Sequence, residues 1–587
     1  MKIPSLLLTI AMSILYTTTA NSCHKEHQGH LKHSIIPEPQ VAEAGCGTGA
    51  VVSQNTLLLA TGKEQQNSAS FFKNYLLKYY GIEVQIVSSQ KEIDKKIKKG
   101  KKSSIIEFTI SKLDKTVQGL PEYGYEPADL AKEGAYFMKV NNGKATLYGA
   151  NPQGLFYATQ SLVQLLPTFT NGQKPEQPLS ATGIGNLSIQ EITVLDYPRF
   201  EYRGMHLDVV RHIYSVDYIK QYIDYLAQHK MNYFHWHLTD DQGWRMESKS
   251  HPKLNEIGSW RAGTIIGIFP GTGVDSTRYG GHYTIEQMKE VIDYAAQRYI
   301  TIVPEIDVPG HSMAILATYP QFSTTPDIPK EPAITWGIYN RQNNVLAPSS
   351  QVFEFLEDVF NELMDVFPGQ YIHIGADECA KKWWEESPQT QQYMKEHGIE
   401  DENALQKYFA QRIADIVHAR GRKFIGWDEM LDDGLVDGAI VMSWRNAENG
   451  LKAAAQGHKA ILTPMRQSYF NVAQKENEDS LCHRQWLVRV DDVYNFEPVP
   501  EDTPASVAQN ILGGQGCMWT EYFPHRQRLE YGLFPRMSAI AEVYWSNPQK
   551  KNWPRFQLKL IEQFNRYDLW GANYSTEIFR SSNYSRD

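Results

Sequence analysis

The segment Tyr371-Ile-His-Ile-Gly-Ala-Asp-Glu-Cys379 is an apolar run that ends in two adjacent carboxylates. Its length and composition are typical of a buried parallel strand, and Asp377 and Glu378 fall where that strand should end. Neighbouring residues on a regular strand point to opposite faces, so both acids serve one site only if the backbone turns there. Such turns occur at the C-terminal rim of a β/α barrel, where active sites form. An acidic surface turn is the alternative for an isolated Asp-Glu pair.

Outward from this segment, apolar strand patterns alternate with amphipathic helical patterns over the chain after Pro198. The strand patterns are Gly204–Val210, Tyr233–Leu238, Ile300–Ile306, Tyr371–Gly375, Lys423–Gly426, Ala439–Ser443, Ala460–Thr463 and Ile511–Met518. The helical patterns between them include Val216–Lys230, Ile285–Tyr299, Val352–Phe367 and Leu405–Arg420. Strands joined by helical crossovers in this number predict an α/β fold, a (β/α)8 TIM barrel rather than an open sheet.

The region before the barrel has a mixed pattern. Helical spacing covers Ser68–Tyr80 and Gly154–Leu166, and Asn141-Asn-Gly143 between two strand patterns is a hairpin signal. We therefore predict a small α+β domain over residues 35–196, followed by the barrel with C-terminal helices over residues 197–587.

The first residues are typical of an export signal. Lys2 precedes the apolar run Ile3–Tyr16, which is too short for a stable membrane span. We predict a signal peptide over residues 1–22 and a flexible tether over residues 23–34. Cys23 resembles a bacterial lipoprotein site, and ordinary signal-peptidase cleavage nearby is the alternative. The expected location is the periplasm or the outer membrane of a Gram-negative bacterium, with membrane contact only through a lipid on Cys23.

The charge balance excludes one class of partner. The 587 residues include 58 basic and 67 acidic side chains, for a net charge of −9. Nucleic-acid binding depends on neutralising phosphates with positive charge, so no nucleic-acid partner is predicted.

Polar and aromatic residues follow every predicted barrel strand. They are Asp208 and Arg211, Asp240-Asp241, Glu305 to His311, Asp377-Glu378, Trp427 to Glu429, Trp444-Arg445, Tyr469 to Asn471, and Trp519 to Glu521. The C-terminal ends of barrel strands meet at one rim. Acids, tryptophans, one arginine and one tyrosine at that rim describe a polar pocket walled by indoles, which is typical of a carbohydrate site.

Two glycosidase mechanisms compete for this pocket. An ordinary retaining enzyme needs two carboxyl groups about 5–5.5 Å apart on either side of the bond, which adjacent residues cannot easily provide. In the substrate-assisted alternative, the 2-acetamido oxygen of the sugar attacks the anomeric carbon. One carboxyl then protonates the leaving oxygen while its neighbour steadies the amide nitrogen, and adjacent acids fit that division.

The motifs resemble those of family 20 glycoside hydrolases of the bacterial exported type, the β-N-acetylhexosaminidases, over nearly the whole mature chain. The motifs are Gly204-Met-His-Leu-Asp-Val-Val-Arg-His212, Asn232-Tyr-Phe-His-Trp-His-Leu-Thr-Asp-Asp-Gln242, Pro304-Glu-Ile-Asp-Val-Pro-Gly-His311 and His373-Ile-Gly-Ala-Asp-Glu378. The resemblance implies exo-action on a terminal N-acetylhexosamine of a glycan substrate, without a cofactor or metal. It leaves the oligomeric state open.

The resemblance also implies roles for single residues. Glu378 would be the general acid and then the base, and Asp377 would accept the acetamido N–H and stabilise an oxazolinium intermediate. Tyr469 would donate to the acetamido oxygen. The walls around the acetamido methyl would be Trp427, Trp444 and Trp519, and the ligands of the O3 and O4 hydroxyls would be Arg211 and Glu521. Asp240, Asp307 and His311 would support the acid pair, or they are simply satisfied polar core residues.

Asn471 departs from the pattern that the family shows after the seventh strand, where Tyr-x-Asp places an acid near the C6 hydroxyl. A neutral amide there removes repulsion toward a 6-sulfate, and Arg466, His483 and Arg484 lie in the same loop. One hypothesis is tolerance of 6-sulfated N-acetylglucosamine. The alternative is a neutral exchange that still binds the O6 hydroxyl.

Two rival functions remain. His235-x-His237 resembles the metal-binding strand of barrel amidohydrolases, with His311, His373 and an aspartate as further ligands. A glycan-binding protein without catalysis is the other, and it predicts the loss of an acid or of the tyrosine.

Overall fold

The computed structural model describes residues 31–97, 104–113, 125–168, 186–432, 434–478 and 480–579. The predicted signal peptide (residues 1–22) and Cys23 lie outside these ranges. The chain divides into two compact units, one of Met1–Arg199 with Gln549–Ala572 and one of Phe200–Pro548 with Asn573–Asp587.

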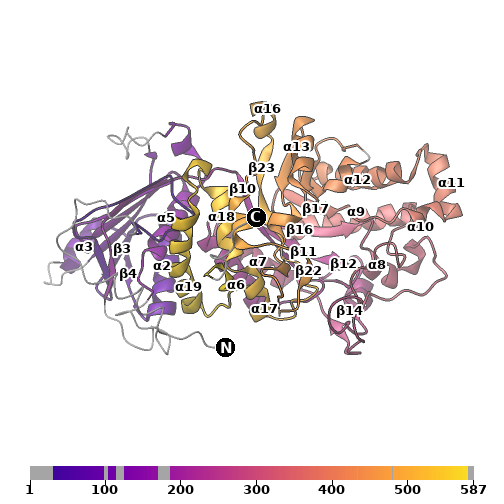
Figure 1. Cartoon of the computed structure of the whole chain (residues 1–587), viewed down its shortest axis with the longest axis horizontal. Coiled ribbons are helices and arrows are strands. Elements are labelled where there is room, and N and C mark those ends of the chain that lie inside the picture. The colour runs from indigo at the N-terminus through magenta and orange to yellow at the C-terminus, as the bar shows by residue number, and fades with distance from the viewer. Residues whose placement is uncertain are drawn as a thin grey trace. The chain divides into compact units, whose positions relative to one another are not determined.

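The second unit is a closed barrel of parallel strands, which confirms the predicted (β/α)8 fold (Figure 1). Around the barrel the strands are β10 (Tyr202–Asp208), β11 (Tyr233–His237), β16 (Thr301–Val308), β17 (Tyr371–Gly375), β18 (Lys423–Trp427), β19 (Ile440–Ser443), β20 (Lys459–Leu462) and β23 (Ile511–Gly516). β10 pairs with β23 and closes the ring. All eight predicted strand patterns are strands of this barrel.

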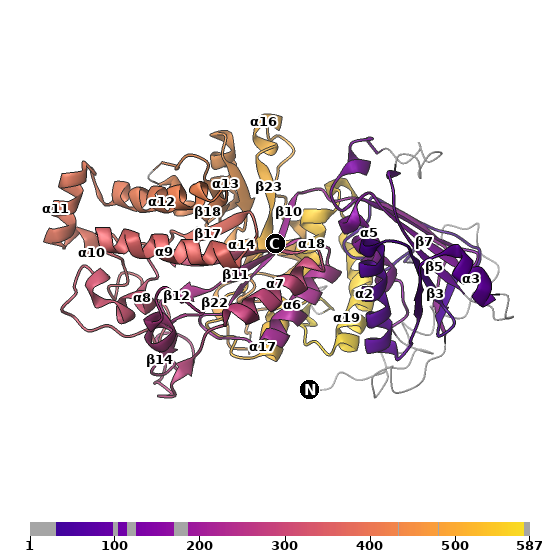
Figure 2. The same ribbon diagram turned by 180° about the vertical axis from the view of Figure 1, so that it is seen from behind.

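Capped helices connect the strands. Ser215, Thr284, Ser349 and Asp401 each accept a backbone N–H from the first turn of the helix that they precede, which fixes where α6, α7, α9 and α12 begin. The helices of this unit are α6 (Val216–Gln228), α7 (Ile285–Ala296), α8 (Met313–Thr318), α9 (Ser350–Val366), α10 (Lys382–Glu385), α11 (Pro388–His397), α12 (Glu402–Ala419), α13 (Ala447–Ala455), α17 (Arg526–Leu533) and α18 (Arg536–Trp545). Figures 1 and 2 both show α9 and α12 side by side.

Short helices and strands lie in two of the connections between barrel strands. The gap between β20 and β23 holds α14 (Met465–Ser468), β21 (Val472–Ala473), β22 (His483–Leu487), α15 (Val490–Asn495) and α16 (Ala505–Ala508). Small antiparallel pairs follow β11: β12 (Thr239–Asp240) with β13 (Gly243–Trp244), and β14 (Trp260–Arg261) with β15 (Tyr279–Gly280). The elaborated loop predicted after the seventh strand is therefore partly regular.

The first unit is built on a mixed sheet of order β1-β9-β6-β7-β5-β3-β4. Its strands are β1 (Val41–Ala44), β3 (Leu57–Ala60), β4 (Gln85–Val87), β5 (Ile105–Ile110), β6 (Tyr136–Asn141), β7 (Lys144–Gly149) and β9 (Ile192–Asp196), with a separate pair β2 (Ala50–Ser53) and β8 (Asn186–Ile189). Its helices are α2 (Lys63–Tyr80), α3 (Gln90–Ile97) and α5 (Pro152–Gln164). The predicted hairpin is β6–β7, and Asn142 and Gly143 at its tip have positive φ.

The last long helix, α19 (Trp553–Trp570), belongs to this first unit, whereas we expected residues 197–587 to form one domain. α19 lies beside α2 and α5 in both views (Figures 1 and 2), and Trp570 Nε1 donates to the Tyr75 hydroxyl at 3.1 Å. Apolar residues at helical spacing, including Phe556 and Leu560, are buried. A helix at the far end of the sequence therefore completes the N-terminal unit.

The expected tether over residues 23–34 ends earlier than predicted. The His33 side chain is buried and its Nε2 lies 3.5 Å from Glu38. The Ser34 hydroxyl donates to the Gln164 carbonyl at 3.0 Å. Local polarity suggested a linker here, but the partners that bury His33 and Ser34 come from α5 and from the segment after residue 35.

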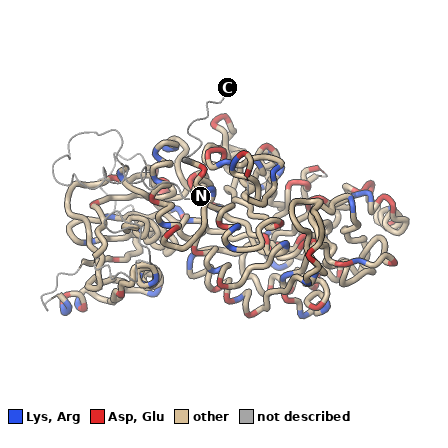
Figure 3. The backbone as a smooth tube through the Cα atoms, turned by 60° about the horizontal axis from the view of Figure 1, so that its bottom comes forward, with Lys and Arg blue, Asp and Glu red and all other residues tan. Residues whose placement is uncertain are grey.

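Acidic and basic residues are interspersed along the backbone in Figure 3. Within the described ranges, no helix combines the length and the apolar character that crossing a membrane requires.

Candidate functional site

The backbone turns sharply at the end of β17. Gly375, Ala376 and Glu378 have φ values of 69°, 69° and 41°, in the left-handed region. A Cβ at Gly375 would lie 1.8 Å from Asp307 Oδ1, so only glycine fits there. The turn brings both acids to one imidazole: His311 Nε2 lies 3.6 Å from Asp377 Oδ2 and 3.5 Å from Glu378 Oε2. The two neighbouring carboxyl groups therefore face one site.

The two acids differ in environment. The Asp377 side chain is 13% exposed and that of Glu378 is 40% exposed. Burial raises the pKa of Asp377 to about 7 against the opposing effect of His311, and the charges of Glu378 and Glu305 add to the rise. Glu378 is the more accessible acid, which suits a group that exchanges protons with a leaving group and with water.

His311 links the acid pair to a buried aspartate pair. Its Nδ1 lies 3.2 Å from Asp240 Oδ1 and 3.1 Å from Asp241 Oδ2. Asn344 Nδ2 donates to both carboxyl oxygens of Asp241, at 3.1 and 3.0 Å. Burial opposes a charge on His311, but the negative groups, above all Asp240, raise the pKa of its imidazole well above the ordinary value. A charged, firmly held imidazole thus faces Asp377 and Glu378.

Asp240 and Asp307 are buried and differ in charge. Arg211 and His237 contact Asp240 Oδ2 at 2.7 and 3.0 Å, and despite burial they and His311 hold the pKa of Asp240 well below its usual range. Burial and the nearby Asp377 raise the pKa of Asp307 well above its usual range. Asp307 Oδ1 has no hydrogen-bond partner among the described residues. Asp307 is therefore the neutral member of the set beside the acid pair.

Arg211 follows β10 and is held by three groups. Its guanidinium lies 3.2 Å from Asp208, 2.7 Å from Asp240, and 2.8 Å from the Gln242 amide oxygen to which it donates. It also lies over the ring of Trp519, 5.1 Å from the ring centroid. A planar donor fixed in this way can present its free edge to adjacent hydroxyl groups.

Glu521 lies near Arg211 on the loop after β23. His483 Nε2 lies 3.4 Å from its carboxylate. Although burial opposes the charge, His483 and Arg211 lower the pKa of Glu521 to about 2. Glu521 Oε2 has no partner among the described residues, so a charged acceptor remains available at this side of the pocket.

Aromatic rings from separate strand ends form one cluster. Trp427, Tyr469 and Trp519 are buried together, and Trp444 packs against them. The ring of Tyr469 is stacked with Trp444 at 6.2 Å and lies 6.2 Å from Trp519, which lies 6.0 Å from Trp427. Flat apolar walls of this kind exclude water around a small group such as a methyl.

The indole N–H groups of two of these rings are fixed by carboxylates. Trp427 Nε1 donates to Glu305 at 3.0 Å, and Trp444 Nε1 donates to Glu429 at 3.0 Å. Burial, with Asp377 and Asp428 nearby, raises the pKa of Glu429 to about 8. These two hydrogen bonds therefore fix the orientations of the Trp427 and Trp444 rings.

Asn471 is buried beside the Glu521 end of the pocket. Its carbonyl accepts the backbone N–H of His483 at 3.2 Å, and its side-chain Oδ1 has no partner among the described residues. Of the basic side chains in its loop, His483 contacts Glu521, Arg484 donates to the Ser480 carbonyl at 3.3 Å, and Arg466 is exposed.

All the residues that the sequence singled out lie at the C-terminal rim of the barrel or in the layer just beneath it. Sequence reasoning gave no role to Glu305 or Glu429, and it suggested other roles for His237, as a metal ligand, and for His483, as a charge near a 6-sulfate; in the structure all four hold predicted site residues in place. Glu305 and His237 stand inside the quoted motifs, and their position at strand ends was the available signal.

The histidines of the metal hypothesis have other partners. Both ring nitrogens of His237 face carboxylates, Glu305 and Asp240. Burial opposes its charge, but these two acids raise the pKa of His237 to about 10. A doubly protonated imidazole has no lone pair for a metal, so the His235-x-His237 pair is not a ready ligand pair. A remaining candidate group for a metal is His206, His235 and Glu305, whose ligand atoms lie within 4.8 Å of one another.

Comparison with known families gives two matches. The catalytic domain of glycosyl hydrolase family 20 matches residues 200–548, and domain 2 of glycosyl hydrolase family 20 matches residues 32–197.

Individual relatives agree with these matches. A beta-hexosaminidase of Porphyromonas gingivalis is 38% identical over 77% of this chain and 56% of its own length. A beta-hexosaminidase of Vibrio furnissii is 35% identical over 70% of this chain and 65% of its own length. The crystal structure of a GH20 exo beta-N-acetylglucosaminidase from Vibrio harveyi in complex with N-acetylglucosamine is 29% identical, with a TM-score of 0.76 over 94% of this chain and 80% of that one. The chain thus spans less than two thirds of the length of the first two relatives.

Proposed function

The chain belongs to glycoside hydrolase family 20, and from this premise we propose that it is an exo-acting, retaining β-N-acetylhexosaminidase. It would remove terminal β-linked N-acetylglucosamine or N-acetylgalactosamine from glycans. The observation that carries the proposal is the turn after β17, which directs Asp377 and Glu378 to one imidazole in a barrel whose strand ends also carry a cluster of aromatic rings. Relatives named as beta-hexosaminidases support it.

The proposed reaction uses the acetamido group of the substrate as nucleophile. Its oxygen bonds to the anomeric carbon while the glycosidic bond breaks, and Glu378 gives its proton to the departing oxygen. Asp377 accepts the acetamido N–H and balances the positive charge of the oxazolinium ring. Water then attacks the anomeric carbon, Glu378 takes a proton from it, and the acetamide re-forms. Two inversions at one carbon give net retention.

The remaining groups of the site have matching tasks. Tyr469 lies in the same aromatic cluster as the tryptophans and would donate its hydroxyl to the acetamido oxygen. Arg211 and the charged Glu521 would bind the O3 and O4 hydroxyls, Arg211 as the donor and Glu521 as the acceptor of hydrogen bonds. The aromatic rings would keep water away from the oxazolinium ring and so prevent its premature hydrolysis.

The proposal is tested by comparing two aryl glycosides. We expect release of nitrophenol from the β-N-acetylglucosaminide and none above background from the matching β-glucoside, because only the first carries the internal nucleophile. Turnover of both would require a nucleophile from the protein and would contradict the role of Asp377. Turnover of neither would favour a glycan-binding protein.

A finer part of the proposal concerns substitution at O6. Asn471 places a neutral amide where an aspartate would repel an anion, and no described cation contacts its side chain. We therefore propose tolerance of 6-sulfated N-acetylglucosamine without preference for it.

The change Asn471→Asp tests this tolerance. We expect it to lower kcat/KM for the aryl 6-sulfo-N-acetylglucosaminide by about 10²-fold, because like charges in a buried site repel by several kcal/mol. The unsulfated substrate should change by less than about threefold, since an aspartate also binds a hydroxyl group. If the wild-type enzyme cleaves the sulfated substrate far more slowly than the unsulfated one, the tolerance is refuted.

A further inference from the structure

One buried carboxylate collects polar groups from three other strands of the barrel. Glu305, on β16, has no exposed surface. Its Oε1 accepts the Trp427 indole N–H at 3.0 Å and lies 2.9 Å from His373 Nδ1. Its Oε2 contacts His237 Nδ1 and lies 3.1 Å from His235 Nε2. Four nitrogen groups therefore converge on one residue that the sequence pattern did not single out.

The charges within this cluster are balanced locally. A buried carboxylate is costly unless it is paired and hydrogen-bonded. The pKa of Glu305 is held well below its usual range because the three histidines outweigh its burial. His237 is the cation that pairs with it, and the pKa of His237 is raised to about 10 despite burial.

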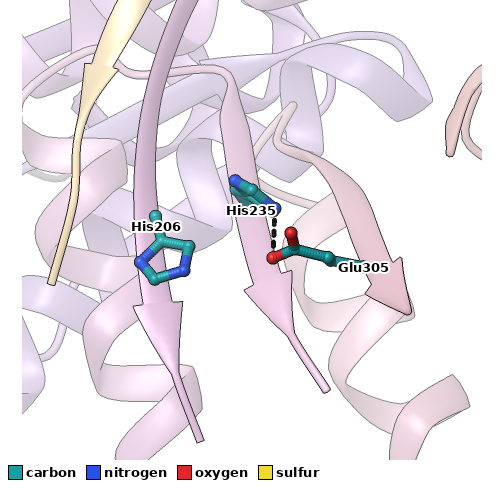
Figure 4. A group of neighbouring side chains, drawn as sticks. All are labelled: His206, His235 and Glu305. Atoms are coloured by element: carbon teal, nitrogen blue, oxygen red, sulfur yellow. Dashed lines mark ion pairs between the residues drawn. The ribbon is translucent and has the colours of Figure 1, made fainter. Parts of the chain in front are cut away.

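Two neighbouring histidines, His235 of this cluster and His206 beside it, are neutral. Burial lowers the pKa of His235 to about 4 and that of His206 well below its ordinary value. Gln515 Nε2 donates to His235 Nδ1 at 2.9 Å, so the ring proton of His235 sits on Nε2, which lies 3.1 Å from Glu305 Oε2 and has no hydrogen-bond partner among the described residues. Figure 4 shows this pairing between neighbouring strands, with His206 on the next strand and not joined to Glu305.

Two chains of polar contacts connect Glu305 with the substrate pocket. One is the direct hydrogen bond to Trp427, a wall of the pocket. The other passes through His237 to Asp240 at 3.0 Å, from Asp240 to His311 at 3.2 Å, and from His311 to Glu378 at 3.5 Å. The wall and the acid pair thus share one anchor.

We propose that Glu305 is a positioning residue that fixes Trp427 against the acetamido methyl and, through His237 and Asp240, sets that wall in register with the acid pair. The inference rests on the proposed function. Because the acetamido group is the nucleophile, its aim depends on how closely Trp427 confines it. An error of about 1 Å in such an aim costs about 10²-fold in rate.

The change Glu305→Gln keeps the shape and removes the shared acceptor. Whichever way the amide is turned, its NH2 group meets an N–H group from which Glu305 now accepts, either that of Trp427 or that of His237. We expect kcat/KM for the N-acetyl substrate to fall by about 10²-fold.

The decisive readout is selectivity for the acyl chain. A closed apolar pocket discriminates one methylene by about 10–200-fold, so the wild-type enzyme should strongly prefer the N-acetyl over the N-propionyl aryl glycoside. We expect Glu305→Gln to lower this preference by about tenfold, because the loosened wall admits the longer chain. A purely structural loss would lower both rates and leave their ratio unchanged.

Trp427→Phe provides the second arm, because it keeps an aromatic ring and removes the indole N–H that donates to Glu305, together with one of the two fused rings. It should relax the same ratio in the same direction. If Glu305 acts through Trp427, the double variant should show no larger change than the greater single change. An additive double variant, or an unchanged ratio in either single variant, would overturn the proposal. If Glu305→Gln does not fold, Glu305→Asp takes its place, because it keeps the charge but withdraws the carboxylate from Trp427, and it should lower the acyl preference in the same direction.

Glu530→Gln is the matched control. Glu530 is also a buried carboxylate of the barrel unit, but it accepts from Tyr225 and Arg526 on the outer helices. It should lower the melting temperature without changing the acyl ratio. The metal content of the wild-type protein completes the test, because a divalent ion bound one per chain at Glu305, His206 and His235 would make Glu305 a ligand and overturn the proposal. A wild-type protein inactive on every N-acyl substrate would instead refute the proposed function itself.

Discussion

Replacing Glu378 by glutamine is expected to lower kcat/KM for an alkyl β-N-acetylglucosaminide by about 10³-fold, within the range that general acid–base catalysis contributes. An alkoxide leaves poorly without a proton, and Glu378 is the accessible carboxyl of the pair, at 40% exposure. The nitrophenyl glycoside should lose far less in its first step, because nitrophenolate leaves without protonation. Steady-state rates with both leaving groups measure the difference.

The same variant should respond to azide. Azide needs no general base to attack the oxazolinium carbon, so it should restore turnover of the nitrophenyl substrate and yield the β-glycosyl azide. Glu386→Gln is the control, since Glu386 is an exposed glutamate that follows α10 on the same side of β17, and it should behave as the wild type. Equal losses with alkyl and nitrophenyl substrates, without azide rescue, would show that another group is the acid.

Replacing Asp377 by asparagine should cause the second largest loss of activity, and it should raise the stability of the protein at high pH. The charge that balances the oxazolinium is lost, so kcat/KM should fall by about 10²–10³-fold. In the folded protein the pKa of Asp377 is raised to about 7 by burial and by neighbouring carboxylates. The folded state therefore holds this proton more tightly than the unfolded chain does.

It follows that wild-type stability falls as pH rises from about 4, the pKa of an unfolded aspartate, through about 7. The upper limit of this loss is about 4 kcal/mol. Asparagine does not titrate, so Asp377→Asn should melt above the wild type at pH 8, and the gap should close toward pH 4. Thermal melts across this range measure it.

Asp437→Asn is the control for this series, because Asp437 is exposed in the same unit and should change neither activity nor the pH dependence of melting. If Asp377→Asn melts below the wild type at pH 8, the aspartate is stabilised by its surroundings and the raised pKa is wrong.

The acid pair and its turn could be read from local sequence, because an apolar strand that ends in Gly375, Ala376, Asp377 and Glu378 carries the necessary information within a few residues. The barrel was predictable for the same reason. Each strand and each capped helix is a local pattern, and repetition of the unit determines the fold.

The support beneath the pair could not be read in this way. Glu305 meets His237 and Trp427 across 68 and 122 positions of sequence, and such partners become visible only when strands are set side by side. The predicted limits of the tether and of the barrel domain were wrong for the same reason, since Ser34 bonds to Gln164 and Trp570 to Tyr75, both distant in sequence.

The place of α19 has a consequence for biosynthesis. Domains tend to fold in the order in which they leave the ribosome. Here the N-terminal unit is made first, yet it lacks α19 until residues 553–570 have been synthesised. The apolar residues of the N-terminal unit that α19 covers therefore stay exposed while the whole barrel is translated. A nascent chain of this kind would depend on chaperones for longer than its sequence order suggests, and a premature stop before Trp553 would leave the first-made unit, rather than the last, unfinished.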